Sequence, residues 1–222
     1  MPQLFEPLTL RDVEFRNRIW LTPMCQYSCE ACDGIPTAWH FVHYATRAVG
    51  GFGLVLTEAT AVAPEGRISP QDAGLWNHDQ VAAWRRVVDA VHANGAKIGV
   101  QLAHAGRKAS TSAPWKGGGA LKAEDGAWET FSASAEPFKD DWHTPTAMTP
   151  ADMDRVVAAF EDAVRAGQRD GSVRDGNPAE LAGLLLLLAQ STVQSARLVA
   201  EQLPEDRLTA ELAHAVDAYL RP

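Results

Sequence analysis

The sequence predicts an α/β fold with a parallel sheet, followed by an all-α tail. Up to about residue 166, short apolar segments alternate with segments of helical spacing. Such alternation implies a parallel sheet, either doubly wound or closed into a barrel. Beyond residue 166 no segment has a strand-like pattern, and every aromatic residue except Tyr219 lies at or before Phe160. We therefore expect two parts, residues 1–166 and residues 167–222.

The first part begins with a hairpin over residues 8–15 and continues as three strand–helix pairs. The strands are expected at residues 18–24, 53–62 and 96–104, and the helices at residues 37–49, 80–95 and from 150 onward. The "GGFG" stretch at 50–53 follows a helix and opens a strand, so it is a turn and not a phosphate-binding loop. Asp79 is expected to cap the second helix, and Pro150 to open the third.

Apolar spacing predicts which helix faces lie inward. In the first helix the inward residues are expected to be Trp39, Phe41, Val42, Ala45 and Val49. In the second they are expected to be Val81, Trp84, Val88 and Val91. His40 and His43 lie one turn apart on the first helix, and we interpret them as packing residues and not as metal ligands.

The chemistry of a parallel sheet is found at the carboxyl ends of its strands. This rule selects three stretches, Thr22–Cys25, Glu58–Thr60 and Gln101–His104. The connection after the third strand, from about residue 105 to 148, is long enough to line a site. His104, Arg107 and Lys108 follow that strand, where they could meet an anionic ligand or form a solvated loop.

The charge balance excludes some classes of function. The chain has 222 residues and a net charge of −8, which argues against non-specific binding to nucleic acid or to an anionic membrane. The longest apolar run, Leu181 to Ala189, is far shorter than the roughly 20 residues that a membrane span needs. The N-terminus lacks a signal-peptide pattern. We expect a cytoplasmic protein that binds neither nucleic acid nor membranes.

All three cysteines lie in "MCQYSCEACDG" (24–34), with the spacing C-x3-C-x2-C. This spacing is typical of the iron–sulfur cluster of radical S-adenosylmethionine enzymes. Against a cluster, Ala31 stands where those sequences usually carry an aromatic residue, and no Gly-Gly-Glu follows the second strand. A zinc site lacks an evident fourth ligand. We therefore expect no metal and interpret Cys29 and Cys32 as loop thiols.

Four stretches together resemble one protein family, the old yellow enzymes, and its bacterial thermophile-type branch most of all. They are "LFEPLTLRDVEFRNRIWLTPMCQYS", "GLVLTEATAV", "GRISPQDAGLWNHDQVAAWRRVVDAVHANGAKIGVQLAHAGRKAS" and "MTPADMDRVVAAFEDAVRA", which cover roughly residues 3–166. The resemblance implies a (β/α)8 barrel of the TIM type that binds FMN. It also implies hydride uptake from NAD(P)H and reduction of the C=C bond of α,β-unsaturated carbonyl compounds, as in ene-reductases.

The resemblance also implies roles for single residues. Thr22, Pro23, Met24 and Cys25 would form a wall at the edge of the flavin, with the Cys25 thiol near its O4/N5 side. Tyr27 would reach the substrate carbonyl. Ala59 would be the small residue under the ring, and Gln101 the amide that contacts the pyrimidine edge. An amide suits that edge because it offers both a donor and an acceptor.

The sequence departs from the family beyond residue 166. The family continues with a fourth strand carrying a His-x-x-His or Asn-x-x-His pair, and no such pair follows residue 166 here. Residues 164–222 instead resemble the C-terminal helices of tetracycline-repressor-type regulators, with helices expected over 177–203 and 204–220. We therefore expect an incomplete barrel. The alternative is a non-catalytic remnant whose tail mediates association or binds a small ligand, and we expect self-association through residues 180–200.

Overall fold

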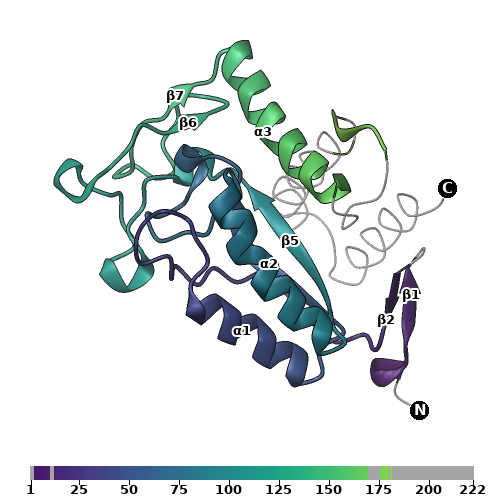
Figure 1. Cartoon of the computed structure of the whole chain (residues 1–222). Helices are drawn as coiled ribbons and strands as arrows, with labels where there is room; N and C mark the ends of the chain where they lie inside the picture. Colours follow the sequence, from purple (N-terminus) through teal and green to yellow (C-terminus); the bar gives the residue numbers. More distant parts are fainter. Residues whose placement is uncertain (1–2, 11–12, 170–175, 180, 182–222) are drawn as a thin grey trace, which may run out of the picture.

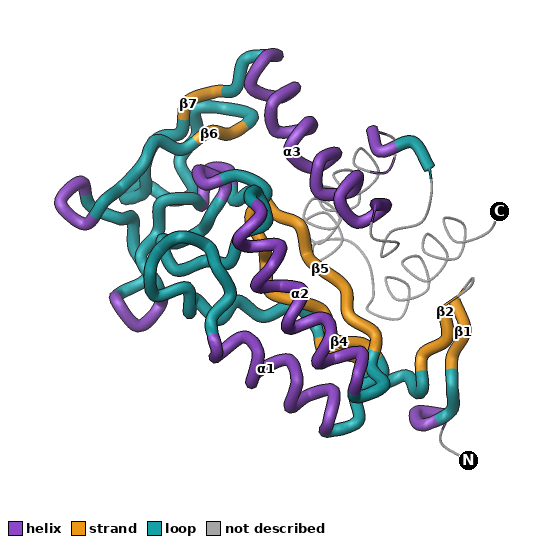
Figure 2. Tube along the Cα trace, in the orientation of Figure 1, coloured by secondary structure: helices purple, strands orange, loops and turns teal. Residues whose placement is uncertain are grey.

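A computed structural model describes residues 3–10, 13–169, 176–179 and 181 (Figure 1). Its centre is a three-stranded parallel sheet in the order β3-β4-β5. The strands are β3 (Trp20–Leu21), β4 (Leu54–Ala61) and β5 (Lys97–Ala103), and the helices are α1 (Ala38–Val49), α2 (His78–Ala93) and α3 (Pro150–Arg169). Helices α1 and α2 lie side by side on one face of this sheet (Figures 1 and 2). The predicted alternation of strands and helices is confirmed.

The remaining elements lie around this layer. The predicted hairpin is β1 (Leu8–Leu10) paired antiparallel with β2 (Val13–Phe15), and it projects away from the central sheet (Figure 2). The long connection after β5 holds β6 (Phe131–Ser132) and β7 (Thr146–Ala147), which pair in parallel. Short 3-10 helices lie at Gln3–Phe5, Pro64–Gly66, Gly106–Lys108, Pro114–Lys116 and Ala123–Asp125. In the part of the chain described, no helix is long and apolar enough to cross a membrane.

The helix starts follow from side-chain capping. Thr37 precedes α1, and its hydroxyl accepts the Trp39 N–H. For α2 the predicted cap is wrong, because the side chain of Asn77, not of Asp79, accepts the Gln80 N–H at 3.0 Å. Asn77 has the extended backbone of an N-cap, while Asp79 is already inside the first turn.

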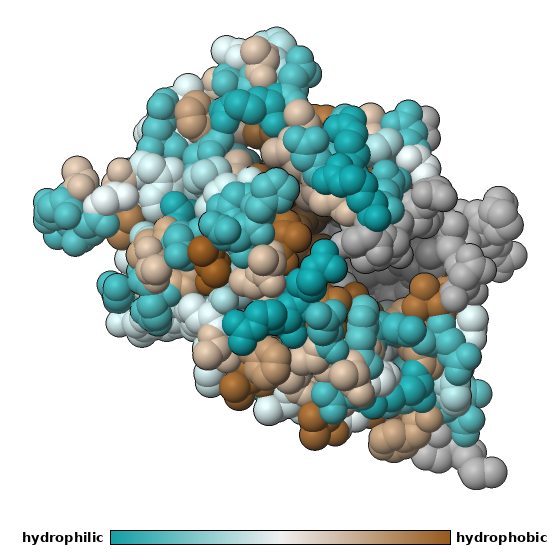
Figure 3. All heavy atoms as spheres, in the orientation of Figure 1, coloured by the Kyte–Doolittle hydropathy of each residue, from teal (hydrophilic) through white to brown (hydrophobic). Residues whose placement is uncertain are grey.

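The predicted inward face of α1 is wrong. Trp39, Phe41, Val42 and Val49 are exposed, whereas the helix buries its polar residues His40, His43 and Tyr44 together with Ala48. Figure 3 shows hydrophobic side chains at the surface over this helix. The physical reason is a carboxylate on β4 that faces α1 and needs hydrogen-bond donors. In α2 the buried valines are Val87 and Val91, so Val87 takes the place predicted for Val88.

Strand β4 contains a bulge. Leu56 pairs with Gly99 and Ala59 with Gln101, so Thr57 and Glu58 together lie opposite the single residue Val100. A bulge adds one residue and re-aims the side chains that follow it. As a result Glu58 points into the helix layer, while Ala59 lies at the half-exposed strand end beside Gln101.

Helix α3 continues past the expected boundary at residue 166 and ends at Arg169. Phe160 of α3 packs with Val62 in a second, smaller core beside the main one. The side chain of Asn177 accepts the Ala179 N–H at 3.0 Å, as a helix cap would. The helices predicted beyond that point, and the self-association predicted for residues 180–200, lie outside the described residues. The two-part division stays a prediction.

Candidate functional site

Three strand ends bring the predicted site residues to one edge of the sheet. Strands β3 and β4 are paired in parallel, so the stretch after β3 begins beside β4. Ala59 of β4 lies directly opposite Gln101 of β5. The Gln26 N–H donates to Glu58 Oε2 at 2.8 Å, which ties the stretch after β3 to the end of β4. Thr22, Cys25, Ala59 and Gln101 therefore share this edge.

Cys25 and Tyr27 are neighbours at this edge. The Tyr27 hydroxyl and the Ala59 N–H both favour the charged form of the Cys25 thiol, but burial outweighs them. Burial, followed by the charge of Asp72, raises the pKa of the Cys25 thiol. Burial, followed by the neighbouring Cys25, raises the pKa of Tyr27 to about 12. Both groups therefore keep their protons at neutral pH, so the edge carries a neutral thiol and a neutral phenol.

The backbone at Tyr27 is unusual. Its φ is +50°, in the left-handed region that residues with a side chain rarely adopt. Such conformations persist only where the surroundings enforce them, and they concentrate at ligand sites. The ring of Trp115 lies edge-on to the Tyr27 ring, with 5.8 Å between the centroids. The long connection after β5 thus reaches back to the strand ends.

The surface beside this pair is open. Thr22, Met24 and Gln101 are exposed, and Ala59 is half-buried. Among the described residues, neither the Thr22 hydroxyl nor the Gln101 amide has a hydrogen-bond partner. A cleft of about 510 Å³ does occur in the molecule, but it lies between the Pro64–Gly66 turn, the long connection and α3. Considering only the residues that the structure describes, the strand ends therefore form an open surface.

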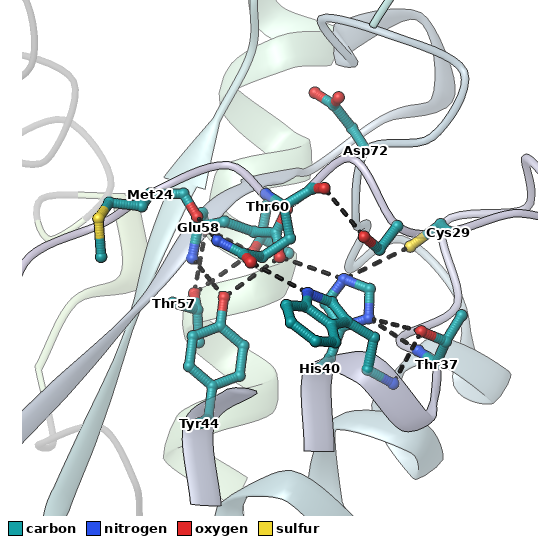
Figure 4. Close-up of polar contacts among 12 residues, drawn as sticks. Met24, Cys29, Thr37, His40, Tyr44, Thr57, Glu58, Thr60 and Asp72 are labelled. Atoms are coloured by element: carbon teal, nitrogen blue, oxygen red, sulfur yellow. Dashed lines mark hydrogen bonds and ion pairs between the residues drawn. The ribbon is translucent and has the colours of Figure 1, made fainter. Parts of the chain in front are cut away.

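Beneath this surface lies a buried polar network around Glu58 (Figure 4). Tyr44 points from α1 toward β4, and its hydroxyl donates to Glu58 Oε1 at 3.2 Å and accepts the Glu58 N–H at 2.9 Å. His40 Nε2 lies 3.1 Å from the same Oε1. All three side chains are about 1% exposed or less.

The hydrogen bonds of His40 define which ring nitrogen carries the proton. Nδ1 lies 2.9 Å from the Thr37 backbone N–H, which can only donate, so Nδ1 is an acceptor. The proton is therefore on Nε2, which donates to Glu58. The Glu58 carboxylate thus accepts from three donors. Two of them, the His40 imidazole and the Tyr44 hydroxyl, lie on α1, and the third is the backbone N–H of Gln26.

The three thiols have three different environments. Cys25 faces Tyr27, whereas the sulfur of buried Cys29 lies 4.0 Å from His40 Nε2. Cys32 is exposed, and its sulfur accepts from the Gln71 amide at 3.5 Å. Across the described residues, no group of three or more His, Cys, Asp or Glu is placed to hold a metal ion. The three sulfur atoms therefore do not converge on one centre.

The cations expected after the third strand do not gather at the edge. His104 packs against Gly66, and burial lowers the pKa of its imidazole, which favours the neutral ring. Arg107 pairs with Glu136, and the Lys108 ammonium lies over the ring of Phe138. The contacts of Arg107 and Lys108 are within the long connection, and that of His104 is with the Pro64–Gly66 turn, so the three residues help to hold these loops.

Sequence reasoning missed the network that supports the edge. Glu58 was selected only as part of a strand-end stretch, and Tyr44 was not selected at all. A carboxylate inside an otherwise apolar strand was the available signal, because such a group needs donors when it is buried. The donors on α1 were hidden by a hydropathy pattern that favoured its other face.

The chain matches one family model, described as the NADH:flavin oxidoreductase / NADH oxidase family, over residues 3–171. It is 44% identical over 168 residues to the NADPH dehydrogenase of Geobacillus sp. (strain WCH70), covering 76% of this chain and 45% of that protein. It is 45% identical over 171 residues to the NADPH dehydrogenase of Listeria monocytogenes serotype 4a (strain HCC23), covering 77% and 46%. The chain thus spans about half the length of these relatives.

Solved structures give the same picture of the fold. The chain is similar to morphinone reductase, with a TM-score of 0.64, 23% identity, and coverage of 86% of this chain and 59% of that one. It is also similar to the old yellow enzyme homologue from Zymomonas mobilis, with a TM-score of 0.62, 27% identity, and coverage of 77% and 46%. The fold is therefore part of a TIM-type barrel, as the sequence predicts.

Proposed function

Because the chain belongs to the NADH:flavin oxidoreductase / NADH oxidase family, we propose that it carries the flavin-ring side of an FMN-dependent NAD(P)H oxidoreductase site. We further propose the ene-reductase type, acting on α,β-unsaturated carbonyl compounds. One observation carries this proposal. Cys25, Tyr27, Ala59 and Gln101 meet at the carboxyl ends of adjacent parallel strands, where the chemistry of such sheets is found.

The residues at the edge fit the ring of FMN. The Gln101 amide, which has no partner among the residues that the structure describes, offers a donor and an acceptor, and this suits a ring edge that has both kinds of group. Ala59, opposite Gln101, has a small side chain that allows a flat ring to approach. The thiol of Cys25 is neutral, so it places no charge against the ring. FMN, when bound, would supply the hydride chemistry.

Tyr27 is proposed to donate a hydrogen bond to the substrate carbonyl. Its pKa of about 12 keeps the hydroxyl protonated over the whole physiological range. A donor aimed at a carbonyl oxygen stabilises the negative charge that develops there during hydride addition. The Tyr27 hydroxyl lies beside the Cys25 sulfur, which is only a weak acceptor and competes little with a carbonyl oxygen.

A second candidate is a non-catalytic remnant. One observation favours it: within the described residues the central sheet has three strands, with β3 and β5 at its edges. The family resemblance places the FMN phosphate on later strands. Each charge-assisted hydrogen bond to a phosphate contributes roughly 1.5–3 kcal/mol, so a chain without those bonds would bind FMN more weakly by orders of magnitude. We therefore expect the chain alone to lose FMN on desalting and to show no enone-dependent NADPH consumption.

The two candidates separate in an equilibrium titration of FMN, followed by quenching of flavin fluorescence. The flavin-site proposal predicts weak binding that Gln101→Ala reduces about tenfold, because the amide supplies hydrogen bonds to the ring. Lys97→Ala is the matched control, since Lys97 is exposed at the other end of β5 and should not change the affinity. Absence of binding at millimolar FMN, or equal effects of both variants, would favour the remnant. Enone-dependent NADPH oxidation by the desalted chain would show that its own site suffices.

A further inference from the structure

The stretch from Cys25 to Tyr27 has few anchors. Its backbone contact with the sheet described above is the bond from the Gln26 N–H to Glu58 Oε2, at 2.8 Å. The Gln26 side chain accepts from Trp39 Nε1 at 3.0 Å and donates to the Met24 carbonyl at 2.7 Å, and both of these contacts are exposed. The contact to Glu58 is part-buried, as is the bond from the Ser28 hydroxyl to the Gln26 carbonyl at 2.9 Å, but of the two only the Glu58 contact ties the stretch to the sheet.

Glu58 is itself held from three directions. The bulge at Thr57 and Glu58 turns its side chain into the helix layer, where Tyr44 and His40 donate to Oε1. The other oxygen, Oε2, accepts the backbone N–H of Gln26. One oxygen thus binds the helix and the other binds the stretch that carries the thiol and the phenol.

We propose that Glu58 is a positioning residue, which holds the Cys25–Tyr27 backbone against the end of β4 and thereby enforces the left-handed conformation of Tyr27. This inference builds on the proposed function, because the stretch it positions is the proposed flavin wall. Glu58 does not reach the open surface, being 1% exposed, and its hydrogen bond to this stretch is made to Gln26.

Substitution by glutamine tests the geometry because an amide has only one acceptor oxygen. All three partners of Glu58 are donors in this arrangement, and His40 cannot reverse its role while Nδ1 accepts from Thr37. In the Glu58→Gln variant, the amide oxygen can keep accepting from His40 and Tyr44. The NH2 group of the new side chain then faces the Gln26 N–H, which is also a donor. The bond to the stretch is then lost while the bonds to α1 remain.

Asp72 provides a matched control for the loss of charge. It is also buried, and its charge contributes more than that of Glu58 to the raised pKa of Cys25, after burial itself. Its carboxylate accepts from Ile68 N–H, Ser69 N–H and the Ser69 hydroxyl, and none of the hydrogen bonds among the described residues joins it to Cys25–Tyr27. Asp72→Asn therefore removes a charge near the same thiol without removing the anchor.

The test is the rate of alkylation of each cysteine by iodoacetamide at neutral pH, with no flavin present. Chymotryptic cleavage after Tyr27 separates Cys25 from Cys29 and Cys32, and fragmentation of the peptide that holds the last two assigns the label to each of them. We expect Glu58→Gln to raise the Cys25 rate tenfold or more and Asp72→Asn to raise it much less. Tyr44→Phe, which keeps the Glu58–Gln26 bond, should change it by less than threefold.

Two results would overturn the proposal. If Asp72→Asn accelerates Cys25 as much as Glu58→Gln does, charge and not position controls the thiol. If Glu58→Gln exposes buried Cys29 as much as Cys25, Glu58 stabilises the whole layer and positions nothing in particular. Since the readout contains no flavin, it remains decisive even if the chain proves not to bind FMN.

Discussion

The two sides of strand β4 differ in how their polar groups are satisfied. On the helix side, Glu58 and Tyr44 are buried and every polar atom of their side chains has a partner. On the side of the strand ends, Thr22 and Gln101 are exposed and their side chains have none among the described residues. The difference distinguishes side chains that stabilise the fold from side chains that we propose to contact a ligand. Glu58 and Tyr44, which join the helix to the strand, have all their side-chain hydrogen bonds made, whereas the two side chains proposed to meet a ligand have none among the described residues.

The largest test of this contrast is Glu58→Leu. The variant leaves the His40, Tyr44 and Gln26 donors buried without an acceptor, and we expect a loss of about 3–5 kcal/mol in the free energy of unfolding. Urea denaturation measures it. Gln101→Leu on the open side should change stability by less than about 0.5 kcal/mol. Equal losses for the two variants would mean that the two sides do not differ as described.

The free energy of unfolding should vary with pH because a second buried carboxyl group, that of Asp72, titrates. Burial raises its pKa from 3.8 to about 6 in the folded chain. A raised pKa means that the folded state favours the protonated acid. Its contribution is therefore present below about pH 4 and is lost as the pH rises through 6, on the order of 2–3 kcal/mol.

Urea denaturation at several pH values, compared with Asp72→Asn, isolates this contribution. The difference in unfolding free energy between the native chain and the variant should change between pH 4 and 7 and be flat above that range. A difference that does not vary with pH would show that Asp72 ionises as easily in the folded chain as in the unfolded one.

A smaller effect is expected from Tyr44→Phe. The phenol both donates to Glu58 and accepts the Glu58 N–H, so its removal leaves one buried N–H unpaired but keeps two donors on the carboxylate. We expect a loss of about 1–3 kcal/mol. The thermal midpoint measured by circular dichroism checks it, with Tyr27→Phe on the more open side as the control. A larger loss in the control would place the main support at Tyr27.

Much of the fold followed from the sequence because strand and helix periods are local. The hairpin at Leu8–Phe15 and the alternation up to α3 were predictable for that reason. So were the strand ends that hold Cys25 and Gln101. The bulge at Thr57 and Glu58 was not, because a two-residue period does not report an extra residue opposite Val100.

The face of α1 was mispredicted for a related reason. Hydropathy assigns Trp39 and Val42 to the core, but a buried carboxylate on the neighbouring strand requires donors, and these are His40 and Tyr44. This requirement arises only when the strand and the helix are packed together. The pattern of the helix alone does not indicate that the carboxylate needs donors. The network that supports the site was therefore the part that could not be predicted from the sequence.

The smallest expected effect tests that reversed face. Val42 of α1 is 49% exposed and Val87 of α2 is 2% exposed, so the same substitution by alanine samples both environments on neighbouring helices. Val87→Ala should cost about 1–3 kcal/mol, because it removes buried methyl groups and leaves a cavity. Val42→Ala should change stability by less than about 0.5 kcal/mol, since the side chain loses little contact and alanine favours a helix. Urea denaturation of the two variants measures both. If Val42→Ala costs as much as Val87→Ala, the outer face of α1 is covered in solution, and its apolar residues do pack inward against a further element, as their spacing predicts.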